Sequence, residues 1–61
     1  MKTGILTKRE EEIIKLLIKG YNNTEIAAKL SISKFTTKAH VSSIISKLQV
    51  SNRVQVVVKY L

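Results

Sequence analysis

Residues 22 to 48 have the sequence NNTEIAAKLSISKFTTKAHVSSIISKL. Asn22 is a suitable helix N-cap, Glu25 sits at the third helical position, and apolar residues then recur at helical spacing. The three residues 31–33 form a turn, in which Ile32 is an apolar plug and Ser33 can cap the next helix. We therefore expect helices over residues 23–30 and 34–48.

The expected helix over residues 34–48 has two unlike faces. At 100° per residue, one side carries the residues that we expect to face other helices: Thr37, Val41, Ile44, Ile45 and Leu48. The opposite side is mostly small and polar: Phe35, Thr36, Ala39, Ser42, Ser43 and Ser46. Lys38 lies at one edge of that side, and His40 and Lys47 lie at the other. Such a face suits a groove of a nucleic acid, where bulky acids would clash or repel.

Two further helices are expected around this pair, over residues 8–19 and 52–60. Thr7 and Glu10 have the spacing of a capping box, and Gly20 tolerates the left-handed conformation that ends many helices. The valines after Ser51 favour a strand by propensity alone. A solitary strand would have no partner among three helices, so we expect a helix that Ser51 caps.

With 61 residues, the chain can form one small domain. Residues 1–5 show no periodicity and are interpreted as a flexible arm or the remnant of a linker before a domain over residues 6–61. The expected fold is all-α, a compact four-helix bundle that contains a helix-turn-helix. The chain has no cysteine and one histidine, so we expect no metal, no cofactor and a core of aliphatic side chains.

The charge of the chain is strongly asymmetric. Its formal net charge is +7, and the residues after Glu25 include no acid but six cations: Lys29, Lys34, Lys38, Lys47, Arg53 and Lys59. A uniformly cationic half favours a polyanionic partner. Apolar runs are no longer than three residues, far below the roughly 20 of a membrane span. Without a signal-peptide pattern, a cytoplasmic location is expected.

Residues 6 to 58 resemble, without a gap, the LuxR-type helix-turn-helix domain that the spore regulator GerE and the NarL/FixJ response regulators share. The resemblance rests on residues at the family's spacing: Leu6, Thr7, Arg9, Glu10, Glu12, Ile13, Ile14, Leu16, Gly20, Asn23, Glu25, Ile26, Ala27, Leu30, Ile32, Ser33, Thr36, Lys38, His40, Val41, Ile44, Lys47, Leu48, Val50, Asn52, Arg53 and Gln55. It implies four helices, the second and third forming the helix-turn-helix and the fourth mediating dimer contact on DNA. Members usually carry the domain at the C-terminus of a longer regulator, although the GerE type stands alone.

By this resemblance, the base-reading positions are Phe35, Lys38, Ala39 and Ser42. The residues implied near phosphates are Asn23, Thr24, Thr36, Lys47 and Arg53, and His40 is a further phosphate candidate from its place on the helix. The last helix has surplus apolar residues on two stripes, and those expected to mediate dimerisation are Val54, Val58 and Leu61. Two positions depart from the family pattern: Thr37 replaces the usual valine, and Phe35 replaces a common polar residue.

Several of these residues have a second interpretation. Lys38 could donate to guanine, act as a charge on a phosphate or be solvated. Phe35 could contact a thymine methyl, or fold back onto Lys34 or onto the turn. The acidic run from Glu10 to Glu12 is most simply the solvated start of the first helix, where its charge suits the helix dipole. No constellation supports catalysis, so no enzyme activity is expected.

The leading hypothesis is a sequence-specific, double-stranded DNA-binding domain of a bacterial transcription regulator. Its recognition helix, residues 34–48, would enter the major groove, and two copies would bind half-sites about one helical turn apart. RNA polymerase is a further expected partner, and we expect neither a membrane nor a small molecule. Two alternatives are a cationic helical membrane-active peptide and a helix-turn-helix module used for protein–protein interaction. Since aspartate is absent, any receiver-type phosphoacceptor would lie outside these residues.

Overall fold

A computed structural model describes residues 6–61. Within them the chain forms α1 (Lys8–Ile18), α2 (Asn23–Leu30), α3 (Lys34–Leu48) and α4 (Arg53–Tyr60). The all-α four-helix fold is confirmed, with α2 and α3 at their expected bounds, α1 ending one residue early and α4 beginning one residue late. The expected arm over residues 1–5 lies outside the described part of the chain.

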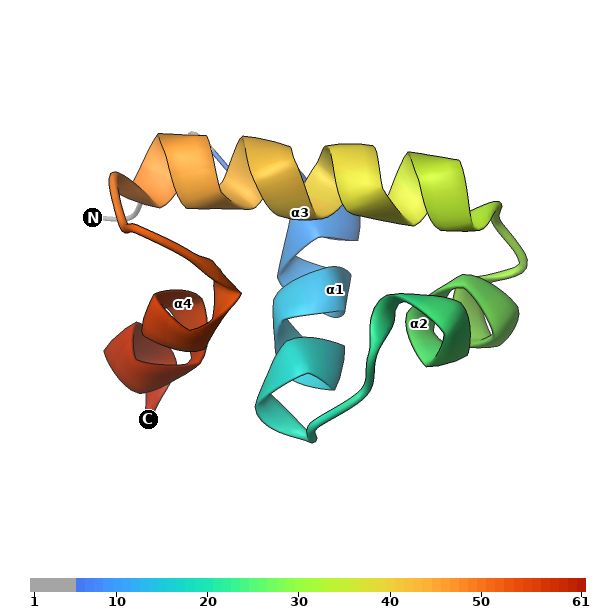
Figure 1. The fold of residues 1–61 in the computed structure, drawn as a ribbon, viewed down its shortest axis with the longest axis horizontal. Coiled ribbons are helices and arrows are strands. Elements are labelled where there is room, and N and C mark those ends of the chain that lie inside the picture. Colours follow the sequence, from blue (N-terminus) through green and yellow to red (C-terminus); the bar gives the residue numbers. More distant parts are fainter. Residues whose placement is uncertain (1–5) are drawn as a thin grey trace.

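The longest helix, α3, runs along one side of the molecule, as Figure 1 shows. The other three lie on one side of it, α2 and α4 near its two ends and α1 between them. α3 contacts all three, while α1 also contacts α4. α1 therefore supports α3 from behind, and the opposite side of α3 is left open.

Side-chain caps start the first three helices where the sequence predicts them. Thr7 and Glu10 exchange two hydrogen bonds, the Thr7 amide donating to Glu10 Oε1 at 2.8 Å and the Glu10 amide to Thr7 Oγ1 at 3.1 Å. Asn22 and Glu25 form the same reciprocal box with both distances at 2.8 Å. Ser33 Oγ accepts from the Thr36 amide at 2.9 Å. Each box satisfies donors that a helix start leaves unpaired.

The predicted cap of the last helix is wrong by one residue. Asn52, not Ser51, precedes α4 in an extended conformation, and its Oδ1 accepts from the Gln55 amide at 3.1 Å. Asparagine and serine are about equally good caps. The preceding turn decides which of the two caps the helix. The local sequence alone does not predict that choice.

The first three helices end in the same way, with one residue in the left-handed conformation. These residues are Gly20 at φ 90°, Ser31 at φ 58° and Gln49 at φ 56°. The amide of the next residue then bonds back across the last turn: Tyr21 to Leu16 at 3.1 Å, Ile32 to Ala27 at 3.0 Å and Val50 to Ile45 at 3.2 Å. This is the Schellman arrangement, which satisfies carbonyls that the helix leaves unpaired.

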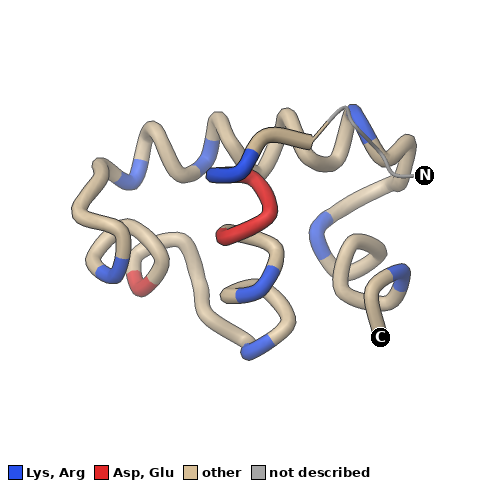
Figure 2. The backbone as a smooth tube through the Cα atoms, turned by 180° about the vertical axis from the view of Figure 1, so that it is seen from behind, with Lys and Arg blue, Asp and Glu red and all other residues tan. Residues whose placement is uncertain are grey.

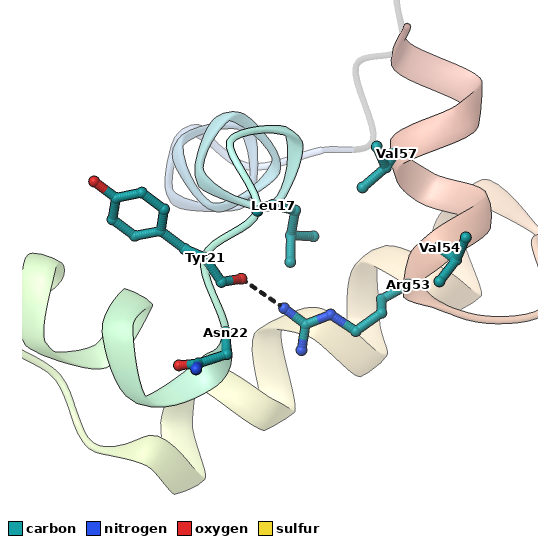
Figure 3. A pocket seen from close by; sticks show the side chains of 7 residues that line it. Leu17, Tyr21, Asn22, Arg53, Val54 and Val57 are labelled. Atoms are coloured by element: carbon teal, nitrogen blue, oxygen red, sulfur yellow. Dashed lines mark hydrogen bonds between the residues drawn. The ribbon is translucent and has the colours of Figure 1, made fainter.

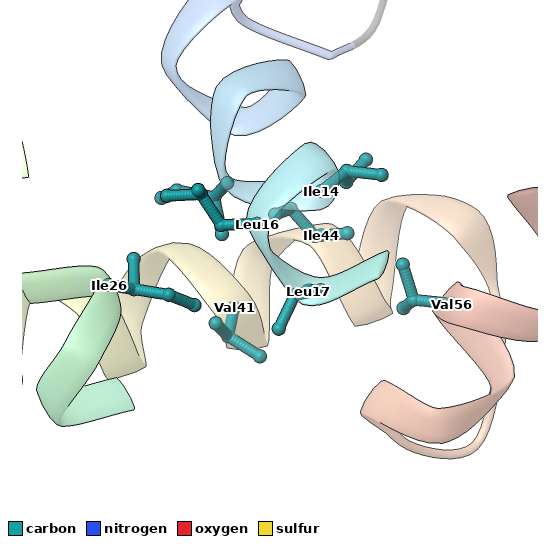
Figure 4. Close-up of a cluster of buried hydrophobic side chains, with 8 residues drawn as sticks. Ile14, Leu16, Leu17, Ile26, Val41, Ile44 and Val56 are labelled. Carbon is teal, nitrogen blue, oxygen red and sulfur yellow. The ribbon is translucent and has the colours of Figure 1, made fainter. Parts of the chain in front are cut away.

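One apolar residue from each helix is fully buried at the centre: Ile13, Ile26, Ile44 and Val56. Figure 4 shows the surrounding cluster. The predicted inner side of α3 is confirmed, since Thr37, Val41 and Ile44 are buried and the other two residues of that side are half-buried. The Thr37 hydroxyl has a partner, because its Oγ1 donates to the Ser33 carbonyl at 3.0 Å. Among the described residues, no helix is long and apolar enough to cross a membrane.

Candidate nucleic-acid interface

The open face of α3 carries the side chains that the sequence predicts as base readers. Phe35, Lys38, Ala39 and Ser42 are all exposed, Phe35 to 81% of its surface. They fall at helical spacings of three, four and seven, so they form one surface of the helix. Because the inner side of α3 is packed in the core, this face has a fixed orientation on the domain.

Two hydroxyls lie at the start of that face. Ser33 Oγ donates to Thr36 Oγ1 at 2.9 Å while accepting from the Thr36 amide. The Thr36 hydroxyl is thus an acceptor inside the protein, which leaves its own hydrogen available to an outside acceptor such as a phosphate oxygen. Ser33 is the cap that was expected, and it also orients Thr36.

The start of α2 is joined to the start of α4 by Arg53. The Arg53 Nη1 donates to Asn23 Oδ1 at 2.7 Å, and its Nη2 donates to the Tyr21 carbonyl at 3.0 Å. Figure 3 shows Arg53 reaching across to Tyr21 beside a shallow groove. Asn23 and Arg53 are half-buried, and Thr24 is exposed. The family resemblance implied that these residues lie near phosphates, but it did not predict the link between Arg53 and Asn23.

The interpretation of Glu10 as a solvated residue is wrong. Its side chain is buried against α3, where Oε2 accepts from Ser43 Oγ at 2.8 Å and Oε1 accepts from Lys47 Nζ at 2.8 Å. Ser43 was expected on the open face; it is half-buried and turned toward α1 instead. The helical periodicity of α3 alone does not predict this contact, because the first turn of α1 covers one edge of that face.

A signal for this contact was present in the sequence of α1. Glu10 precedes Ile13 and Ile14 by three and four positions, so it lies on the apolar stripe that faces the core. Burial alone would raise the pKa of its carboxyl. The hydrogen bonds from Lys47, the Thr7 amide and Ser43, together with the charge of Lys47, outweigh burial and lower the pKa to about 2.

Two other predicted phosphate contacts lie along the same edge of α3. Lys47 is half-buried and bound to Glu10, which leaves its ammonium two further N–H donors. His40 is also half-buried. The part of the chain from residue 6 to residue 61 contains no group of three metal-binding side chains.

The acidic residues are confined to one part of the described structure. Figure 2 shows acidic residues on α1 and at the start of α2, whereas α3 and α4 carry only lysine and arginine. Glu10 is neutralised by Lys47 at 2.8 Å, and Glu12 lies 3.7 Å from Arg9. The open face of α3 is therefore free of negative charge and suited to a polyanion.

One apolar stripe of α4 faces solvent. Val56 is fully buried, while Val54, Val58 and Leu61 are exposed to 62%, 57% and 87% of their surfaces. These three are the residues that the sequence predicts for dimerisation.

Comparison with known proteins gives matches along almost the whole chain. The family model described as bacterial regulatory proteins, luxR family (GerE), matches residues 4–60. The response regulator protein VraR of Staphylococcus aureus is 52% identical over 54 residues, covering 88% of this chain and 26% of that protein. VraR proteins of Staphylococcus saprophyticus and Staphylococcus epidermidis match to the same extent. The chain therefore spans about a quarter of the length of these relatives.

A solved structure supports the same relationship. The structure of the transcription factor GerE aligns with a TM-score of 0.81 and 43% sequence identity, covering 87% of this chain and 79% of that chain. The agreement extends over the four helices described above rather than over a single motif.

Proposed function

This chain belongs to the luxR family of bacterial regulatory proteins and is a helix-turn-helix DNA-binding domain of a transcription regulator; from that premise we propose that it reads specific duplex sequences with α3 in the major groove. The family is not enzymatic. The observation that carries the proposal is the split of α3 into a core-packed side and an open face with all four predicted base readers.

The chemistry of the open face fits the edges of base pairs in the major groove. Lys38 can donate to guanine O6 and N7, and the Ser42 hydroxyl can donate or accept. Phe35 and Ala39 offer apolar contact, which suits the methyl group of thymine. A face that mixes a cation, a hydroxyl and apolar groups can distinguish base pairs better than a uniform lysine stripe, which would mainly add positive charge.

Phosphate contacts would flank this face on both sides. Thr36 lies at its start, Asn23 and Thr24 lie at the start of α2, and the other candidates are His40, Lys47 and Arg53. Each phosphate neutralised by a cation would contribute about −0.9 to the slope of log affinity against log salt. We expect Lys47 to contribute less than a free lysine, because one of its donors is held by Glu10.

Two copies of the domain would bind together, with Val54, Val58 and Leu61 at the contact between them. Half-sites would be spaced about one helical turn apart, as in other dimeric helix-turn-helix proteins. We expect the domain to act in the cytoplasm, where it would meet DNA. RNA polymerase remains a predicted further partner.

The test starts from duplexes selected by this chain from a random pool. Lys38→Ala should lose roughly 1–3 kcal/mol of binding free energy on the selected duplex and should relax preference at one base pair. Lys15→Ala is the matched control, since Lys15 is also exposed but lies on α1. An equal loss by Lys38→Ala on every duplex would show a phosphate contact. Failure of the unsubstituted chain to select any sequence would overturn the proposed function.

A further inference from the structure

The guanidinium of Arg53 has no carboxylate partner among the described residues. It donates to two neutral oxygens, Asn23 Oδ1 at 2.7 Å and the Tyr21 carbonyl at 3.0 Å, from residues about 30 positions away in the chain. Within residues 6–61 the ion pairs are Arg9 with Glu12 and Lys47 with Glu10. The Arg53 guanidinium therefore binds two neutral groups and links the start of α4 to the start of α2.

The partner on Asn23 fixes which end of its amide points where. A guanidinium has only donors, so the side of the amide facing Arg53 has to be the oxygen. Oδ1 and Nδ2 branch from the same carbon, so Nδ2 and its two hydrogens point in a different direction from Oδ1, which is held at 2.7 Å. Nδ2 has no acceptor among the described residues, and none of their buried side-chain nitrogens lacks a partner, so Nδ2 is open to solvent. Asn23 is the first residue of α2 and is partly exposed.

We propose that Arg53 is a positioning residue for DNA binding: it holds the Asn23 amide with Nδ2 turned outward, where Nδ2 donates to a phosphate oxygen of the duplex. This rests on the proposed function and deepens it by assigning roles within the predicted phosphate contacts. Arg53 then acts through Asn23 instead of adding an independent contact. An ordered amide binds a phosphate without losing rotamer freedom at that step, because the entropy cost of ordering it is met when the domain folds.

Lysine cannot replace arginine in this arrangement. Its ammonium is a single point charge, whereas the guanidinium offers a planar fork that reaches two oxygens at once. Arg53→Lys therefore keeps the charge near the DNA but loses the fixed hold on Asn23 and Tyr21. If Arg53 served as a plain phosphate cation, that substitution would leave affinity almost unchanged.

The experiment is a double-mutant cycle on the selected duplex, using Arg53→Lys, Asn23→Ala and the double variant. Each single substitution should weaken binding about 10-fold, the effect of one hydrogen bond to a charged group. The double variant should bind no more weakly than Asn23→Ala alone. Lys59→Met is the control for removing a cation from α4 without touching Asn23, because Lys59 is exposed at the other end of that helix.

A second readout separates positioning from general stability. The side-chain amide signals of Asn23 in a nitrogen-15 spectrum should be sharp in the free chain, shift when duplex is added, and become averaged in Arg53→Lys while the backbone spectrum stays dispersed. Losses that multiply in the double variant, or Asn23 signals unaffected by Arg53→Lys, would overturn the inference. Absence of binding by the unsubstituted chain would instead refute the proposed function.

Discussion

The Lys47 ammonium lies 2.8 Å from Glu10 Oε1, and the same oxygen accepts the Thr7 amide at 2.8 Å. One carboxylate thus caps the start of α1 and binds the last turn of α3. Ser43 donates to Oε2. The Glu10 carboxylate therefore accepts one hydrogen bond from the start of α1 and two from α3. The helix proposed to enter the groove is therefore fixed by a polar contact near its end as well as by its apolar inner side.

Removing the charge of Glu10 should destabilise the domain. In Glu10→Gln the Lys47 ammonium loses its counter-charge, and an NH2 group, which can only donate, replaces one of the two carboxylate oxygens that accept hydrogen bonds. Breaking a buried pair costs about 3–5 kcal/mol, but the Lys47 side chain is 32% exposed, so solvent reduces the expected loss to about 1–3 kcal/mol. Urea unfolding followed by circular dichroism measures it. Glu12→Gln, which breaks an exposed pair, should change stability by less than about 0.5 kcal/mol; equal effects of the two substitutions would contradict the prediction.

The same contact makes stability depend on acid. The pKa of Glu10 is lowered from 4.5 to about 2 in the folded chain, so the folded state binds this proton less readily than the unfolded state. Its contribution is therefore fully present above pH 4.5 and is lost as the pH falls toward 2. The amount at stake is about 1–3 kcal/mol, as for Glu10→Gln, because solvent at the partly exposed Lys47 side chain weakens the pair.

Urea midpoints between pH 7 and pH 2.5 test this dependence. The free energy of unfolding should decline most steeply below pH 4.5, and Glu10→Gln should show a shallower decline because it has no carboxyl at that position. Parallel curves for the two proteins would assign the acid sensitivity to other groups.

The caps of the first three helices could be predicted because each depends on residues three positions apart. Thr7 with Glu10, and Asn22 with Glu25, satisfy neighbouring backbone groups without help from the rest of the fold. The open face of α3 was also predictable, since helical periodicity separates it from the apolar side. The start of α4 was not, because Ser51 and Asn52 are adjacent and both can cap a helix.

The contacts that sequence reasoning missed join distant parts of the chain. Glu10 meets residues 33 and 37 positions away, and Arg53 meets residues 30 and 32 positions away. Helical periodicity describes each helix alone and gives no crossing angle between α1 and α3. A polar residue on an apolar stripe, as Glu10 is, indicates that a partner exists but does not name it.

The exposed stripe of α4 should be needed for joint binding of two copies but not for folding. Val58→Asn changes a side chain that is 57% exposed, so stability should stay within about 0.5 kcal/mol. Affinity for a duplex with two half-sites should fall at least several-fold, while affinity for a single half-site should not change. Fluorescence anisotropy with the two duplexes measures both.

The neighbouring Val56 provides the contrast for that substitution. Val56→Asn introduces a polar group at a fully buried position and should unfold the domain or cost several kcal/mol. An equal fall on single and double half-sites for Val58→Asn would show that this residue acts on DNA or on folding rather than between copies.

Phe35 should contribute to the choice of sequence rather than to the strength of the fold. It is 81% exposed at the start of α3, so Phe35→Ser removes no buried area and should leave thermal stability unchanged. Against DNA it removes the apolar surface that a thymine methyl would contact. We expect a loss of about 1 kcal/mol on selected duplexes that contain thymine at the contacted pair, and little loss when uracil, which lacks the methyl, replaces that thymine. Tyr60→Ser, at the other end of the chain, serves as the control for losing an exposed aromatic ring. If the variant and the unsubstituted chain discriminate thymine from uracil equally, Phe35 does not read the methyl group and its ring lies elsewhere in the complex.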